Sequence, residues 1–155
     1  MSQVRATKEK ATFRQAVSVS AEIAAPAERV WGLLTSVAAQ RDWNSTLVSI
    51  DGAIEEGAVV VVVAHSDPKR TFKLKVSDVV ADRSMAWSDG NLMFRGVRTF
   101  ELQPTDMGVR FEMREEFSGW MLPMISGSLP DFVPVFETYA NDLKRAAEQG
   151  REETP

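Results

Sequence analysis

The chain has 155 residues, of which 44% are hydrophobic and 26% are charged, and its formal net charge is −4. This length suits one domain with a substantial core, and the negative charge offers no basic surface for nucleic acid. With no cysteine and one histidine, the chain lacks a disulfide framework, a thiol nucleophile and the ligands of an imidazole-based metal site. It also lacks a glycine-rich phosphate loop, so we expect no metal and no cofactor.

No segment has the pattern of a membrane anchor. Residues 1–12 are polar and mixed in charge, unlike a secretion signal, and the longest apolar run, residues 58–64, is far too short to span a bilayer. We expect a cytoplasmic protein without stable membrane insertion. Residues 1–12 and 149–155 are expected to be flexible tails.

The first expected elements are a strand and a short pair of helices. Within residues 13–23 the odd-numbered positions from Val17 onward are apolar and alternate with polar residues, which is the period of a half-buried strand. Pro26 suits the first turn of a helix, so a short helix pair is expected to extend to residue 43. Residues 46–51 then form a short strand.

The middle of the chain has strand patterns. Residues 58–65 are mostly valine, and β-branched residues favour strands. Asp67-Pro68 predicts a turn, after which apolar residues alternate with lysine in a strand through residues 72–76. Asp89-Gly90 is typical of a two-residue hairpin turn, because it accommodates positive φ angles. That turn pairs Trp87 with Leu92 and Met85 with Phe94.

A second hairpin is expected to turn within residues 103–108. If Leu102 lies opposite Val109, then Glu101 lies opposite Arg110, and opposite charges across strands are favourable. A one-residue slip would exchange the two faces, so charge pairing and apolar alternation together predict this register.

In this register Phe100 and Phe111 are buried and opposite each other. The apolar face of the two hairpins comprises Met85, Trp87, Leu92, Phe94, Phe100, Leu102, Val109, Phe111, Met113 and Phe117.

The last expected element is a long helix. Apolar residues between positions 129 and 147 recur at steps of three and four, which places them on one helix face. The helix is expected to begin at Ser128 or Asp131, with Pro134 either in its first turn or at a kink. Because one helix covers only part of a curved sheet, the uncovered part becomes the floor of a cavity.

This order of elements, together with four short segments, resembles a known superfamily. The segments are Ile23-Ala24-Ala25-Pro26-Ala27-Glu28-Arg29-Val30-Trp31 with Leu34, Trp43-Asn44, Glu116-Phe117-Ser118-Gly119, and Leu143-Lys144-Arg145-Ala146-Ala147-Glu148. The chain resembles the START and polyketide cyclase/dehydrase superfamily. The resemblance implies an α+β helix-grip fold over residues 13–148, with a curved seven-stranded antiparallel sheet around the long C-terminal helix. Because members of that superfamily include lipid carriers and aromatase/cyclases, it names no substrate.

Two charged residues, Arg98 and Glu115, interrupt the apolar face. Glu115 is expected opposite Gly96, with Arg98 as its diagonal neighbour. One interpretation is a structural ion pair inside the sheet, because inward charges are seldom unpaired. The other is a polar anchor in an apolar pocket, where the guanidinium holds a carbonyl or carboxylate and Glu115 acts as a base.

Tyr139, the only tyrosine, projects from the apolar helix face and either packs in the core or presents its hydroxyl to the cavity. His65 is interpreted as a surface or rim residue, and Trp31 and Trp87 as core residues. The apolar residues around Trp120 either line a pocket mouth or pack on a second subunit, so a homodimer is possible.

The sequence therefore predicts a protein that binds a small hydrophobic molecule, lipid-like or aromatic, between the sheet and the last helix. The candidate ligand-binding residues are Trp87, Phe94, Arg98, Phe100, Phe111, Met113, Glu115, Phe117, Phe132, Phe136 and Tyr139. One alternative is a cyclase, dehydratase or hydrolase with Glu115 as acid/base and with Arg98 and Tyr139 polarising a carbonyl. Another is an interaction module whose groove, or the region around Trp120, binds another protein.

Overall fold

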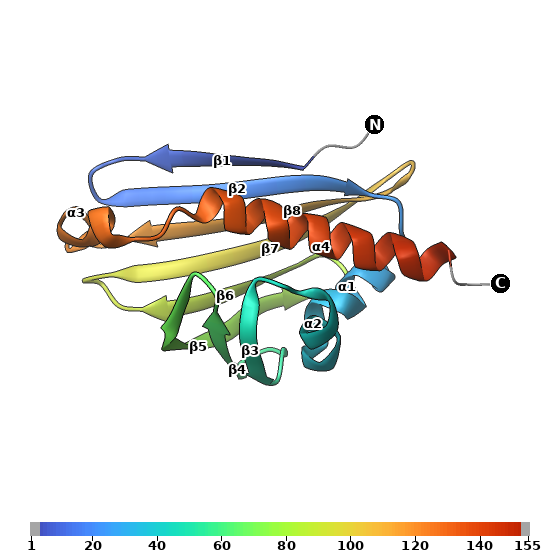
Figure 1. Ribbon diagram of the computed structural model, residues 1–155, viewed down its shortest axis with the longest axis horizontal. Coiled ribbons are helices and arrows are strands. Elements are labelled where there is room, and N and C mark those ends of the chain that lie inside the picture. The colour runs from blue at the N-terminus through green and yellow to red at the C-terminus, as the bar shows by residue number, and fades with distance from the viewer. Residues whose placement is uncertain (1–3, 153–155) are drawn as a thin grey trace.

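The computed structural model describes residues 4–152, which form a curved antiparallel sheet with helices on its concave side (Figure 1). The sheet has eight strands in the order β1-β2-β8-β7-β6-β5-β4-β3. Their bounds are β1 Arg5–Lys10, β2 Arg14–Ile23, β3 Leu47–Gly52, β4 Val59–Ala64, β5 Asp67–Val80, β6 Ser84–Gly90, β7 Arg95–Thr105 and β8 Gly108–Ser118. The helices are α1 Ala27–Thr35, α2 Val37–Trp43, α3 Leu122–Ile125, the 3-10 turn η1 Ser126–Ser128, and α4 Phe132–Glu152. This is the predicted helix-grip arrangement, with eight strands rather than seven.

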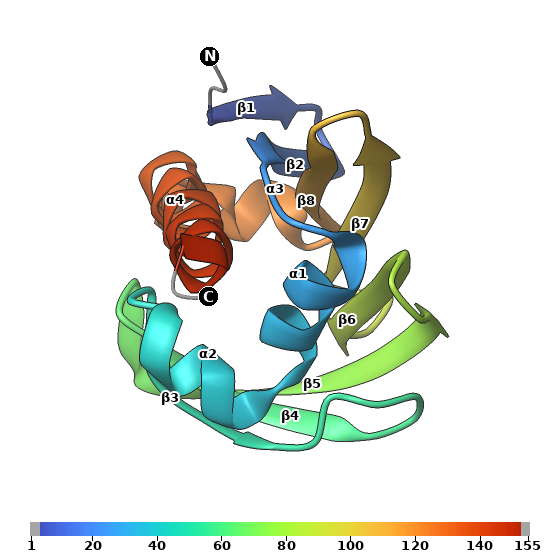
Figure 2. The same cartoon turned by 90° about the vertical axis from the view of Figure 1, so that its right-hand side faces the viewer.

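The sheet curls around α4 and leaves two open edges, β1 and β3 (Figure 2). Helix α4 packs mainly against β2 and also contacts β1, α1 and α2. It begins at Phe132, with Asp131 Oδ1 accepting a hydrogen bond from the backbone N of Val133 at 3.1 Å, so Pro134 lies in its first turn. The helix extends to Glu152, into the segment that the sequence predicts to be a tail.

The additional strand is β1, in a segment that the sequence predicts to be part of a flexible tail. It pairs with β2 from Arg5 opposite Ser20 to Lys10 opposite Gln15. Its residues show little apolar alternation, because most of its side chains are exposed and its ladder is a sheet edge. Backbone pairing, polar contacts and the packing of Ala6 against the core hold this strand, and hydrophobic periodicity does not detect so short an apolar contact.

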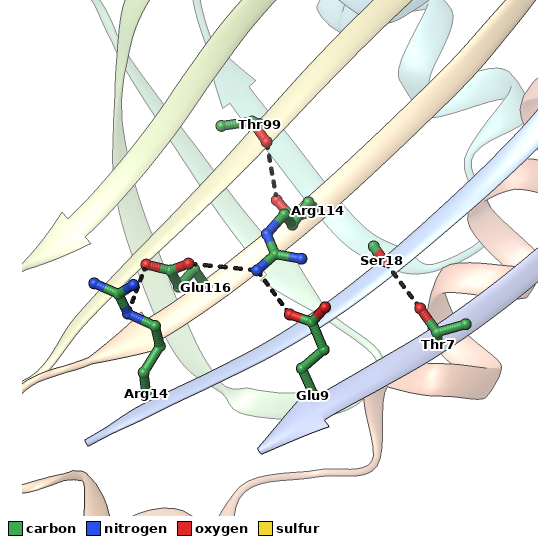
Figure 3. A network of polar contacts seen from close by, with 7 residues as sticks. All are labelled: Thr7, Glu9, Arg14, Ser18, Thr99, Arg114 and Glu116. Carbon is green, nitrogen blue, oxygen red and sulfur yellow. Dashed lines mark hydrogen bonds and ion pairs between the residues drawn. The ribbon is translucent and has the colours of Figure 1, made fainter. Parts of the chain in front are cut away.

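Polar side chains link β1, β2 and β8 on one face of the sheet (Figure 3). Arg114 Nη2 lies 2.9 Å from Glu9 Oε2 and 3.5 Å from Glu116 Oε2, and Arg14 Nε lies 3.3 Å from Glu116 Oε1. Thr7 and Ser18 share a hydrogen bond of 3.1 Å. The hydrogen bond that Arg114 donates to Glu9 raises the pKa of the Arg114 guanidinium above its ordinary value.

Arg114→Ala should lower the free energy of unfolding by no more than about 1 kcal/mol, because the side chains of Arg114 and Glu9 are 40% and 68% exposed and water screens their attraction. Urea unfolding of Arg114→Ala and Glu9→Ala measures this. A loss of more than about 2 kcal/mol would show that this network, rather than the backbone ladder, holds β1.

The predicted turn at Asp89-Gly90 is wrong by several residues. Strand β6 continues through Gly90, and the turn lies at residues 91–94, where Asn91 N donates to Phe94 O at 3.0 Å. Asn91 Oδ1 also accepts a hydrogen bond from Met93 N at 2.8 Å, so the asparagine side chain organises this turn. Leu92, predicted on the apolar face, is therefore 89% exposed.

The pairings predicted for this first hairpin change with its turn. Trp87 pairs with Arg98 and Met85 with Phe100. The turn between β4 and β5 also differs from the prediction. Asp67 already pairs with Ala64, so the chain reverses at residues 65–66 rather than at Asp67-Pro68.

The register of β7 and β8 is shifted by two residues from the prediction. Leu102 pairs with Phe111 and Thr105 with Gly108, so only two residues remain in the turn. A shift of two keeps each side chain on its predicted face, and Phe100 and Phe111 are fully buried. They are not opposite each other, because Phe100 faces Met113.

The charge pairing that supported the predicted register is also absent. Glu101 faces Glu112, and Arg110 instead contacts Glu112 along its own strand at 3.2 Å. The observed register places Arg98 directly opposite Glu115, where the sequence predicts a diagonal contact.

Candidate functional site

A cavity of about 550 Å³ lies between the concave face of the sheet and the N-terminal half of α4, beside α3 and η1. Its apolar walls include Leu47, Val62, Phe72, Leu74, Trp87, Met93, Phe94, Phe117, Met121, Ile125, Leu129, Phe132, Val135 and Tyr139. Its volume and lining are typical of sites for small molecules.

The two ends of α4 explain the position of this cavity. At the C-terminal end, Arg29 of α1 donates hydrogen bonds to Ala147 O at 2.8 Å and to Ala146 O at 3.2 Å. Val30 and Leu34 of α1 and Leu143 and Ala147 of α4 are fully buried there. Helix α1 does not reach the N-terminal end of α4 (Figure 1). Small lining residues such as Gly96 leave the cavity unfilled there.

Arg98 and Glu115 form an ion pair in the cavity wall. Trp87, Arg98 and Glu115 pair in a row across β6, β7 and β8. Arg98 Nε donates to Glu115 Oε1 at 2.7 Å, and Arg98 Nη2 lies 2.7 Å from the same oxygen. The two side chains are 22% and 18% exposed, so the pair is largely desolvated.

Aromatic rings of α4 cover the guanidinium. The Arg98 Cζ atom lies 5.0 Å from the ring centroid of Phe136 and 6.0 Å from that of Tyr139, within the range of cation–π attraction. Glu115 Oε2 and Arg98 Nη1 make no hydrogen bond within the described residues. The ion pair therefore keeps one acceptor and one donor group for a ligand.

Tyr139 is buried, and its hydroxyl has no hydrogen-bond partner among the described residues. Burial raises the pKa of Tyr139 to about 12, and the nearby charge of Arg98 and the side chain of Gln40 only partly offset that rise. The hydroxyl has no surface open to the cavity, and neither has the indole nitrogen of Trp87. Both rings therefore serve as walls in this conformation.

Three buried polar residues that the sequence analysis did not select also line the cavity. Gln40 Oε1 accepts from Asn44 Nδ2 at 2.8 Å, and Asn44 Oδ1 accepts from Thr46 Oγ1 at 2.6 Å. Gln40 Nε2 donates to Leu34 O at 2.9 Å, so the cluster is tied to α1. In the sequence, Asn44 stands out only as part of Trp43-Asn44, one of the segments that carry the family resemblance. Hydrophobic periodicity cannot identify a single buried asparagine.

Seven of the predicted ligand-binding residues line the cavity: Trp87, Phe94, Arg98, Glu115, Phe117, Phe132 and Tyr139. The other four, Phe100, Phe111, Met113 and Phe136, lie in the solid core instead. Contact with a ligand stays a prediction for the first group. Arg98 contacts Glu115, and the Tyr139 ring lies 6.0 Å from the Arg98 Cζ atom, but the catalytic roles of these three residues stay predictions.

The remaining candidates lie outside the cavity wall. His65 is exposed in the turn between β4 and β5, as expected of a surface residue. Within residues 4–152 no cluster of acidic, histidine or cysteine side chains could hold a metal ion, and every helix there is too short or too polar to cross a membrane. Trp31 is a core residue and so is Trp87, which also lines the cavity, whereas Trp120 is exposed near the cavity.

A family model described as "Polyketide cyclase / dehydrase and lipid transport" matches residues 14–149. The chain belongs to this family. No curated protein matches the sequence. The family name covers both enzymes and carriers, so it leaves the chemistry of this cavity open.

Solved structures share the fold at low sequence identity. A protein of unknown function from Staphylococcus aureus has 13% identity and a TM-score of 0.68, over 94% of this chain and 98% of that one. A protein from Rhodobacter sphaeroides has 16% identity and a TM-score of 0.68, over 93% and 98%. A protein from Nitrosomonas europaea has 16% identity and a TM-score of 0.65, over 93% and 99%. These likenesses show the helix-grip fold.

Proposed function

We propose that the protein binds a small, mainly apolar molecule in the cavity between the sheet and α4, with the Arg98–Glu115 pair as its polar anchor. The observation that carries this proposal is the cavity itself, about 550 Å³ with a largely aliphatic and aromatic wall and one internal ion pair. Burial of an apolar ligand there would remove its surface from water and supply the main driving force for binding.

The geometry favours a binding role over catalysis for the ion pair. Both contacts from Arg98 go to one oxygen of Glu115, so the guanidinium already occupies the oxygen that would otherwise accept a proton from a substrate. The Tyr139 hydroxyl, the predicted polarising group, has no surface that a substrate can reach in this conformation. A cyclase or dehydratase reaction would need that side chain to move.

A cavity-filling variant tests the proposal. Leu74→Trp should place an indole in the cavity and abolish ligand binding while keeping the fold, because Leu74 is a lining residue. A ligand at 100 times its dissociation constant should stabilise the unmodified protein by about 2.7 kcal/mol, measured by thermal shift with fatty alcohols, fatty acids, sterols and aromatic polyketides.

Val80→Trp is the matched control, because Val80 is exposed on the same strand and outside the cavity. This variant should respond to ligand as the unmodified protein does. Equal ligand stabilisation of Leu74→Trp and Val80→Trp would place the ligand elsewhere and refute the proposal.

A further inference from the structure

We infer that the cavity selects uncharged ligands, which present a hydroxyl or carbonyl oxygen to Arg98 and Glu115, over carboxylates and ammonium ions. This inference rests on the proposed function and names the ligand class that the same cavity takes. The charges of the wall and the geometry of the ion pair support it.

In the interior of the cavity, the wall carries one charge of each sign. Arg98 and Glu115 neutralise each other at 2.7 Å. The other charged lining residues are Asp67, Arg70 and Asp89, two carboxylates and one guanidinium, at the ends of β5 and β6. Neither group leaves an excess of positive charge to hold an anion.

A charged ligand would therefore either break this pair or lie beside a like charge. A carboxylate could reach the Arg98 guanidinium fully only by displacing Glu115, and the displaced side chain would be a largely buried, unpaired charge. An ammonium ion would find Glu115 Oε2, but it would lie beside the guanidinium of Arg98. Transfer of either ion from water carries a desolvation cost that this neutral pair does not offset.

An uncharged oxygen fits the pair without breaking it. Arg98 Nη1 has free donors, and Glu115 Oε2 is a free acceptor. A hydroxyl can accept from the first and donate to the second, and a carbonyl can accept from the first. Gly96 adds room at this point, because a Cβ atom there would lie 3.4 Å from Glu115 Oε2.

The test compares three amphiphiles with the same alkyl chain: lauryl alcohol, laurate and laurylammonium. Each is titrated below its micelle concentration at neutral pH, with tryptophan fluorescence as the readout. The unmodified protein should bind the alcohol at least about tenfold more tightly than either ion, a difference of about 1.4 kcal/mol.

Single substitutions in the pair should invert this preference. Glu115→Gln leaves Arg98 as an excess positive charge and should bind laurate more tightly than the alcohol. Arg98→Gln leaves Glu115 as an excess negative charge and should bind laurylammonium more tightly than the alcohol. Because either variant alone can show the inversion, the inference is still tested if the other fails to fold. Glu116→Gln is the matched control: Glu116 pairs with Arg14 and Arg114 outside the cavity, and its variant should keep the preference of the unmodified protein.

The outcomes separate the inference from the proposed function. If laurate or laurylammonium binds the unmodified protein as well as the alcohol does, or if neither substitution changes the order, the inference is overturned while ligand binding stands. If none of the three amphiphiles binds, the inference fails, and the proposed function fails with it when the sterols and aromatic polyketides of the thermal-shift series do not bind either.

Discussion

Glu115→Met should destabilise the protein by on the order of 2 to 4 kcal/mol, because it leaves the Arg98 guanidinium without its partner. The loss of one member of a fully buried ion pair costs about 3 to 5 kcal/mol, and the partial exposure of these side chains reduces that figure. The guanidinium also lies against the Phe136 ring, so it cannot easily turn to water.

The double variant Arg98→Met/Glu115→Met should recover most of this loss. Methionine is flexible enough to fill an irregular apolar site, and replacement of both charges removes the desolvation cost together with the attraction. Urea unfolding of the two single variants and the double variant gives the coupling energy between the two side chains. A double variant less stable than Glu115→Met would contradict this account and show that each side chain stabilises the fold by other contacts.

The sequence predicts the faces of the strands better than their register. Apolar alternation correctly places Phe100 and Phe111 inside and Glu101 outside, because side chains alternate strictly along a strand. A shift of two residues keeps every side chain on the same face, so alternation alone cannot distinguish the observed register from the predicted one. Charge pairing favoured the register that the structure does not have, because exposed charges contribute little to the stability of a sheet.

The sequence likewise predicts that a cavity exists, but it does not predict where along the strands the cavity lies. Periodicity shows which face of β7 and β8 is apolar, but not where α1 stops filling the space above it. For this reason the sequence predicts Phe100 and Phe111 as lining residues together with Trp87 and Phe94, although the first two lie in the core. The lining residues of β4 and β5, including Val62, Phe72 and Leu74, have a clear strand pattern, but the curvature that brings them under α4 comes from the whole sheet.

Tyr139 should not ionise until about pH 12 in the folded protein, whereas in the unfolded chain it should ionise near its ordinary pKa of about 10. The cause is burial, because the hydroxyl has no contact with water, and the charge of Arg98 and the side chain of Gln40 offset only part of the rise. Because the folded state holds this proton more tightly than the unfolded state, the contribution to stability is fully present below about pH 10. It declines as the pH rises from about 10 towards 12, where the unfolded chain has lost its proton and the folded chain has not.

This chain allows a direct measurement, because Tyr139 is its only tyrosine and the near-ultraviolet absorbance of tyrosinate reports that residue alone. A pH titration in water and in urea, followed by absorbance and by circular dichroism, should show tyrosinate in water only together with unfolding or near pH 12. Tyr139→Phe is the control: it should flatten the alkaline decline in stability and should be neutral or slightly stabilising at neutral pH, because it removes a buried hydroxyl that makes no hydrogen bond. If the folded protein instead forms tyrosinate near pH 10, the hydroxyl is open to the cavity, and Tyr139 becomes a donor that a bound ligand can reach.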